Sequence, residues 1–406
     1  MQRFIRLLSL CVDGRPTQKL LSLRPVPEKR ITSRVCLKLR SYNKENVPLL
    51  AVIDSSAIRE DFHLKGVLLT LLFDHRHAVN IDIGVPDVVI QETNNRYREQ
   101  IQKSLSQHAS ACRDLTKLTQ CQLPQPNIDI DKLVAQHERH LQGVLLQNGA
   151  TPLPLPDMPQ QSLLTRALRR KKPFNESGNG YRDTLIWETI LAHATAHPNQ
   201  RIAFITENTR DFCNKTDSLH DDLIADLTAR SLPDDHVTIY TTLKDFVERE
   251  LLAKLPKPHQ SFVTFTQQHF PAFRLPEAVE PYLLSQLPGR SFSSKDLGQP
   301  EEYEDPTITG VGTPTNIKIL DEIVSPSDKR VIEFNCDCEC LFDCYIDKHE
   351  FWCMDVEEQP SATDWNETYM SAQFYATITI QGYAVFDPTK GDLTDFEITE
   401  IIGNEP

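Results

Sequence analysis

Four acidic residues between positions 54 and 211 stand beside short apolar runs, and their types and spacing could do chemistry. They are Asp54, Glu92, Asp183 and Asp211. Carboxylate oxygens hold hard divalent cations such as Mg²⁺ and Mn²⁺, often together with phosphate oxygens of a substrate. A cation held in this way can neutralise charge on a phosphate and activate a water molecule. These residue types therefore indicate metal-dependent cleavage of a phosphodiester bond.

The apolar runs around these acids predict the elements that would position them. Residues 49–53 are typical of a buried strand that ends at Asp54, and residues 201–206 of a second one. Helices are expected over 62–74, from 86 through 92 towards 105, over 129–147, over 162–172 and over 184–196. Strands that alternate with helices favour a parallel sheet covered on both faces. Such sheets bind ligands at the carboxyl ends of their strands, where the acids would meet.

Each acid also has an ordinary structural explanation when it is taken alone. Asp54 and Asp183 could cap the helices that follow them. Glu92 could lie on a solvated helix face, and Asp211 could be a turn residue. Four acids at strand ends and helix starts nonetheless favour one shared site.

Four motifs in this order resemble the PIN-domain family of metal-dependent nucleases, and in particular a bacterial branch with a large helical insertion. The resemblance covers about residues 49–250, and the third motif is the most specific. The motifs are Val52-Ile53-Asp54, Val85-Pro86-Asp87-Val88-Val89-Ile90-Gln91-Glu92, Gly180-Tyr181-Arg182-Asp183-Thr184-Leu185-Ile186-Trp187 and Ile205-Thr206-Glu207-Asn208-Thr209-Arg210-Asp211-Phe212.

The resemblance implies a three-layer α/β/α fold, a Mg²⁺ or Mn²⁺ site and RNA as the usual substrate. Asp54, Glu92 and Asp183 would then be direct or water-bridged metal ligands. The family often has an aspartate where this chain has Asn208, a neutral ligand, and Asp211 or Glu207 would compensate. The departure leaves both the number of metal ions and catalysis itself open.

Two further residues take a role from the resemblance. The hydroxyl of Thr206 would hold a ligand or a water molecule. Arg182 would contact a phosphate of the substrate, although a surface arginine without a function is an equal alternative.

Positive charge is concentrated before and within this part of the chain. Residues 1–48 form a basic arm, which is either a nucleic-acid contact or a solubilising tail. The expected helix over 162–172 carries a basic cluster that favours a phosphate contact over a plain solvated face. The cluster contains Arg166, Arg169, Arg170, Lys171 and Lys172.

The C-terminal part differs in both pattern and charge. Residues 258–406 contain 8 Lys and Arg against 27 Asp and Glu, whereas residues 1–257 contain 35 and 30. Apolar side chains at every second position predict a strand over 332–346, and further strands are expected over 374–386 and 395–402. We expect a small antiparallel sheet with one acidic face, which would bind a protein partner or act as a brake on the basic half.

Five late cysteines and a histidine raise the question of zinc. Structural zinc sites pair their ligands in turns, whereas four of these cysteines share the apolar side of the predicted strand. Buried packing is therefore the favoured explanation. The residues are Cys336, Cys338, Cys340, Cys344, Cys353 and His349.

Together these features predict an α/β nuclease domain over 49–257, with a helical insertion at about 94–180, followed by an acidic β domain over 258–406. No apolar run is long enough to cross a membrane, and the cysteine content is typical of a reduced, cytoplasmic protein. The predicted function is a metal-dependent endoribonuclease acting on single-stranded RNA, with DNA left open as a substrate. The alternative is a PIN-like module that has lost catalysis and binds nucleic acid or a protein.

Overall fold

The computed structural model describes residues 48–59, 61–121, 123–124, 126–354 and 359–403. Of the basic arm expected over 1–48, all but the last residue lies outside the described residues. Residues 43–406 form one compact unit. Among the helices described, none is long and apolar enough to span a membrane.

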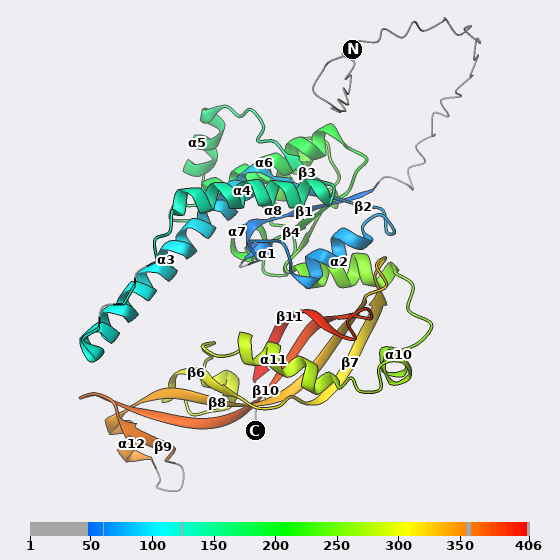
Figure 1. The fold of residues 1–406 in the computed structure, drawn as a ribbon. Helices are drawn as coiled ribbons and strands as arrows, with labels where there is room; N and C mark the ends of the chain where they lie inside the picture. The colour runs from blue at the N-terminus through cyan, green and yellow to red at the C-terminus, as the bar shows by residue number, and fades with distance from the viewer. Residues whose placement is uncertain (1–47, 60, 122, 125, 355–358, 404–406) are drawn as a thin grey trace, which may run out of the picture. The chain divides into compact units, whose positions relative to one another are not determined.

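Five strands form a parallel sheet in the first half of the chain (Figure 1). Their order is β3-β2-β1-β4-β5, so β1 lies at the centre. In the register of β1 with β4, Ile53 is level with Ile205. The residues that follow these two strands therefore meet at the same edge of the sheet. The strands are β1 (Leu49–Ile53), β2 (Ile81–Pro86), β3 (Ala150–Leu153), β4 (Ile202–Ile205) and β5 (Val237–Tyr240).

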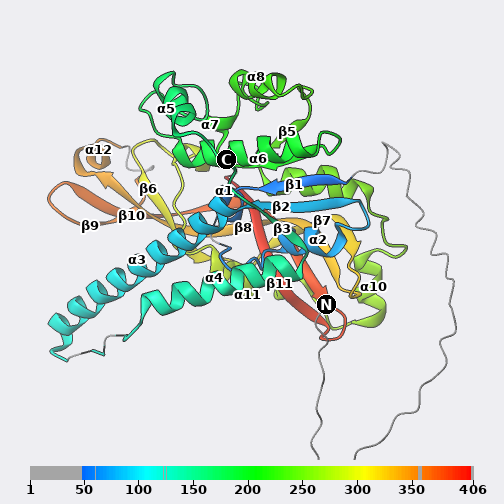
Figure 2. The ribbon, with the colours of Figure 1, turned by 90° about the horizontal axis from the view of Figure 1, so that it is seen from above.

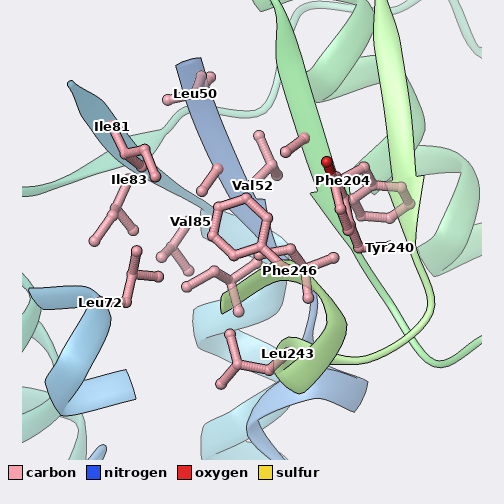
Figure 3. Close-up of a cluster of buried hydrophobic side chains, with 14 of the residues drawn as sticks. Leu50, Val52, Leu72, Ile81, Ile83, Val85, Phe204, Tyr240, Leu243 and Phe246 are labelled. Atoms are coloured by element: carbon pink, nitrogen blue, oxygen red, sulfur yellow. The ribbon is translucent and has the colours of Figure 1, made fainter. Parts of the chain in front are cut away.

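Helices cover both faces of this sheet, as expected of a three-layer α/β/α domain. Figure 3 shows Leu72, Leu243 and Phe246 packed near the buried strand residues Val52 and Ile83. The helical segments are α1 (Ser55–Ile58), α2 (Val67–His75), α3 (Asp87–Thr119), α4 (Ile130–Gln147), α5 (Gln160–Leu168), α6 (Tyr181–Ala196), α7 (Thr209–Phe212), α8 (Asp221–Ala229), α9 (Leu243–Phe246), η2 (Val247–Leu251) and η3 (Leu252–Lys254).

Several of the expected helix boundaries are wrong, among them the end of α3, which reaches Thr119, and local backbone conformation explains two others. The helix expected from residue 62 begins only at Val67, because Leu64 has a left-handed φ of 53° and the Asp61 carboxylate accepts hydrogen bonds from Lys65 and Gly66. The helix expected to reach residue 172 ends at Leu168, and Arg170 has a left-handed φ of 51°. The basic cluster therefore continues past the helix into an irregular segment.

Helices α3 and α4 form the core of the expected insertion, and Figures 1 and 2 both show them side by side. The two helices are joined by buried polar and aromatic contacts. His137 in α4 stacks on Tyr97 of α3 with ring centroids 4.0 Å apart, and its Nδ1 lies 2.6 Å from Asn94 Oδ1. These contacts fix the first half of α3, which carries Glu92.

The C-terminal part is an antiparallel sheet in which β11-β10-β8-β6 are neighbours and β7 and β9 pair at its sides. Cys336, Cys338, Cys340 and Cys344 are all buried on the inner side of β8, so the packing explanation is confirmed. The elements are α10 (Phe262–His269), α11 (Leu275–Gln286), η4 (Lys295–Leu297), β6 (Glu304–Val311), β7 (Thr315–Val324), β8 (Arg330–Asp347), α12 (Lys348–Cys353), β9 (Ser361–Asp364), β10 (Tyr369–Asp387) and β11 (Asp392–Gly403).

The antiparallel sheet shares a hydrophobic core with the parallel one. Val331, Tyr383 and Val385 belong to the same buried cluster as the strands of the parallel sheet. Tyr383 also donates a hydrogen bond to Glu248 at 3.2 Å, and Glu397 accepts one from the backbone of Leu68 at 3.0 Å. A shared core means that the acidic part contributes to the stability of the nuclease-like part.

Replacing Tyr383 by alanine should therefore destabilise the whole compact unit. The side chain is only 1% exposed, and loss of a buried aromatic ring costs about 3 kcal/mol of unfolding free energy. Tyr375 lies on the same strand but is 66% exposed, so Tyr375→Ala is a matched control that should change stability by less than about 0.5 kcal/mol. Denaturant unfolding followed by fluorescence measures both. Equal effects of the two substitutions would show that the sheets do not share a core.

Candidate active site

Asp54 follows the central strand β1 and is held by four hydrogen bonds. Its backbone N–H donates to Ile205 O at 3.0 Å, which continues the ladder between β1 and β4. Its Oδ1 accepts from the Ser55 N–H at 2.7 Å, and its Oδ2 accepts from the hydroxyls of Ser56 and Thr206, each at 2.7 Å. The carboxylate is 3% exposed. Asp54 is therefore fixed in one orientation, and it also caps α1, so the capping and site explanations both apply to it.

Asp183 lies in the first turn of α6, not before it as the sequence indicated. The helix begins after Gly180, whose φ of 127° favours glycine. A Cβ at this position would lie 2.4 Å from the carbonyl oxygen of Pro173. Gly180 therefore allows the segment before α6 to approach the helix start that carries Asp183.

The pKa of Asp183 is raised from 3.8 to about 6. Burial is the largest cause, and the negative charges of Asp54 and Asp211 add to it. A hydrogen bond from Asn208 opposes part of the effect, and the charge of Glu92 adds to it. The other three predicted acids are thus close enough to repel the charged form of Asp183. A cation among them would relieve this repulsion.

Asn208 connects two of the acids. Its Nδ2 donates to Asp183 Oδ1 at 3.0 Å and lies 3.3 Å from Asp211 Oδ2. Its backbone N–H donates to the Thr206 hydroxyl at 3.1 Å. Asn208 and Asp211, which follow β4, are thereby joined to Asp183 at the start of α6.

Glu92 and Arg182 form an ion pair, with Arg182 Nη1 2.7 Å from Glu92 Oε1. Glu92 comes from α3, and its side chain is 15% exposed, whereas that of Arg182 is 67% exposed. The residue predicted to contact phosphate is therefore in contact with one of the predicted metal ligands. Binding of a cation by Glu92 would release this guanidinium towards a substrate.

The basic cluster is largely engaged in ion pairs within the chain. Lys171 Nζ lies 2.5 Å from Asp226 Oδ1, and Arg170 pairs with Glu176. Lys172 Nζ donates to Arg210 O at 2.7 Å and lies 3.4 Å from Asp211 Oδ1. Arg169 is exposed. These contacts hold the segment against the sheet domain, and they leave the expected phosphate contacts a prediction.

A groove of about 1690 Å³ brings the site to the surface. Its lining includes Asp54, Glu92, Asp183, Asn208 and Arg182. It also includes Glu207, the alternative to Asp211, and residues that the sequence did not single out, among them Ser56, Arg96, Arg290 and Phe292. Ser56 was detectable, since a hydroxyl two positions after a strand-ending aspartate is a common partner for it. The groove lies within the compact unit and offers room for an extended polymer.

The donor set suits a divalent cation, because three of the predicted acids, Asp54, Glu92 and Asp183, are among the carboxylates that line one groove. Burial and the neighbouring acids raise the pKa of Asp183, which disfavours its charged form. Within the described part of the chain, no three His, Cys, Asp or Glu side chains are yet close enough together to hold an ion. Glu92 is instead paired with Arg182. Asp54, Glu92 and Asp183 could hold the ion once that pair opens.

The Asp183→Asn variant should be more stable than the wild type at pH 7. A pKa raised in the folded state means that ionisation of Asp183 costs stability, on the order of 2 kcal/mol, once the pH has passed about 6. The cost develops between about pH 4 and pH 6 and is absent below that range. Thermal unfolding of metal-free protein from pH 3.5 to pH 8 measures it.

The matched control is Asp114→Asn, because Asp114 is exposed on α3 and far from the other acids in the sequence. It should leave the pH profile unchanged. Lower stability of Asp183→Asn at pH 7 would contradict the mutual repulsion of the acids.

The comparisons with known proteins agree with this geometry. The family model of the PIN domain matches residues 52–212. Neither the curated proteins nor the solved structures gave a match. The matched segment begins inside β1 and ends with α7, so it contains all four acids of the site. Residues 52–212 are therefore a PIN domain.

Proposed function

We propose that this protein is a metal-dependent endoribonuclease, located in the cytoplasm, that hydrolyses phosphodiester bonds of single-stranded RNA. The observation that carries the proposal is the convergence of Asp54, Glu92 and Asp183 on one groove, with the pKa of Asp183 raised by burial and by its acidic neighbours. Perturbed acids in a groove are typical of catalytic sites. PIN domains are generally nucleases that use divalent cations, which supports the same assignment.

Hydrolysis forms a new P–O bond to a water oxygen, breaks the P–O bond to the leaving oxygen and transfers a proton from the water to that oxygen. A bound Mg²⁺ or Mn²⁺ would supply positive charge for the phosphate and lower the pKa of water. Asp54, held by Ser56 and Thr206, provides a fixed anchor. Asp183 and Glu92 complete the ligand set from α6 and α3.

The residues around these acids would bind the substrate backbone. Arg182 lies on the groove and can pair with a phosphate after it leaves Glu92. Arg96 and Arg290 also line the groove, and neither lies on the element that carries Asp183. Arg169 is exposed, and we propose that it contacts the RNA backbone at a more distant phosphate. Phosphate contacts do not distinguish RNA from DNA, so DNA remains an outcome of the test.

The second candidate is a PIN module that binds nucleic acid or a protein without cutting. Asn208 favours it, because an amide stands where the family often has an aspartate and donates its hydrogens to Asp183 and Asp211. The acidic antiparallel domain would offer a surface for a basic protein partner.

Cleavage of labelled single-stranded RNA and DNA tests the proposal. With Mn²⁺ or Mg²⁺ the protein should cut RNA, and EDTA should stop it. Asp54→Asn and Asp183→Asn should each reduce the rate by at least about 100-fold, since each removes a ligand of the cation. Asp114→Asn is the control and should cleave at the wild-type rate. If folded wild-type protein binds RNA but cuts neither strand, the non-catalytic candidate holds instead.

Arg182→Ala should separate cation binding from substrate binding. The substitution removes a competitor for Glu92, so Mn²⁺ should bind roughly fivefold more tightly. RNA should bind more weakly, because a phosphate contact is lost. Electron paramagnetic resonance of free Mn²⁺ measures the first effect, and filter binding with Ca²⁺ in place of Mn²⁺ measures the second. Arg98→Ala, which breaks a surface pair with Asp131, is the control. Weaker Mn²⁺ binding in Arg182→Ala would contradict the competition.

A further inference from the structure

Lys172 has its main chain fixed on both sides. Its N–H donates to Asp222 Oδ2 at 2.9 Å, and its carbonyl oxygen accepts from Arg166 Nε at 2.9 Å. The guanidinium of Arg166 is itself bound to the buried carboxylate of Asp226 at 2.7 Å. A position held in this way directs a side chain much more precisely than a mobile surface lysine.

The buried carboxylate of Asp226 completes this support. It accepts hydrogen bonds from Arg166, from Lys171 at 2.5 Å and from Trp187 Nε1 at 3.0 Å. Burial, the largest single effect, raises the pKa of Asp226, but the three donors together outweigh it and lower the pKa overall. Trp187 is fully buried in α6, so the support is tied to the same helix that carries Asp183.

The ammonium group of Lys172 points at the end of the acid cluster. Its Nζ donates to Arg210 O at 2.7 Å and lies 3.4 Å from Asp211 Oδ1. The side chains of Lys172 and Asp211 are 21% and 12% exposed, so the pair is well removed from bulk water. Ion pairs with this degree of burial are costly to break from one side.

The second oxygen of Asp211 is also in use. Oδ2 lies 3.3 Å from Asn208 Nδ2, and the same nitrogen donates to Asp183 Oδ1 at 3.0 Å. A continuous chain of contacts therefore runs from Lys172 through Asp211 and Asn208 to Asp183. Asp183 and Asn208 line the groove. Asp211 and Lys172 are not among the described residues that line it.

We propose that Asp211 is a positioning residue, not a metal ligand: together with Lys172 it fixes the Asn208 amide against Asp183, and the site takes one divalent cation. The inference rests on the metal-dependent function proposed above. The cation is held by Asp54, Glu92 and Asp183. Lys172 supplies a fixed positive charge on the side of Asp211 away from Asn208. Without this lysine, a second cation would be needed to offset the negative charge of Asp211.

Counting Mn²⁺ ions tests the assignment without any need for cleavage. Electron paramagnetic resonance titration of the full chain should give one ion in the wild type. Asp211→Asn should still bind one ion, with a dissociation constant raised by no more than about tenfold. Asp183→Asn should raise it by more than about 100-fold. Two ions in the wild type, or an Asp211→Asn variant that binds as weakly as Asp183→Asn, would overturn the proposal.

Thermal unfolding at saturating Mn²⁺ tests the link between Lys172 and Asp211. If Asp211 stays on Lys172 in the loaded protein, Lys172→Met and Asp211→Asn should each lower the Tm by about 3 °C. The double variant should fall no further, because the two residues act as one pair. Lys172→Arg should restore most of the loss. Arg170→Met, in the same segment, should leave the Tm unchanged.

A Tm unaffected by Lys172→Met would mean that the ion pair of Asp211 with Lys172 is broken in the Mn²⁺-bound protein, which overturns the proposal. Wild-type protein that binds no Mn²⁺ would overturn it together with the metal-dependent function. Protein that binds one ion but cuts no RNA would refute only the nuclease, and the assignment of Asp211 would stand.

Discussion

Repulsion among carboxylates at one edge of a parallel sheet is the constraint on which the rest of this site depends. The register of β1 with β4 brings Asp54 next to the residues that follow Ile205, and α6 adds Asp183 to the same place. Burial and this repulsion together raise the pKa of Asp183, with burial the larger cause. The chain offsets the repulsion with its own groups: hydroxyls on Asp54, an amide on Asp183, a guanidinium on Glu92 and an ammonium on Asp211. A cation entering the groove would replace part of this compensation.

The fold and the positions of the main acids could be predicted because they depend on local patterns. Apolar runs followed by acids predicted the strand before Asp54, and the alternation in β8 predicted a buried cysteine face. The helix that follows Asp183 was also expected, although its start at Tyr181 was not. A helix start depends on Gly180 and its close approach to Pro173, which is a tertiary contact without a local signal.

The basic segment shows why side-chain roles were harder to predict. A cluster of Arg and Lys before an acidic site is typical of a phosphate contact, and nothing in its spacing indicates an internal partner. In the structure, Arg166 and Lys171 bind Asp226, which is more than fifty positions later. Distant partners of this kind come from the packing of α5 and α8 around α6, and a single sequence does not reveal them.

The acidic C-terminal part is in the same compact unit as the PIN domain. Tyr383 and Val385 are buried with residues of the parallel sheet, and Arg290 and Phe292 line the groove that contains the acids. Negative charge near the groove would disfavour polyanions that are not paired with cations. The dependence on divalent cations would then serve both substrate binding and chemistry.

The central claim is that this groove holds a divalent cation between Asp54, Glu92 and Asp183. Anomalous X-ray diffraction from crystals grown with Mn²⁺ tests it most directly. We predict one anomalous peak in the groove, within about 2.3 Å of an oxygen of Asp54 and of Asp183, with Arg182 displaced from Glu92. A well-ordered groove without such a peak, with the Arg182–Glu92 pair intact at saturating Mn²⁺, would contradict the account.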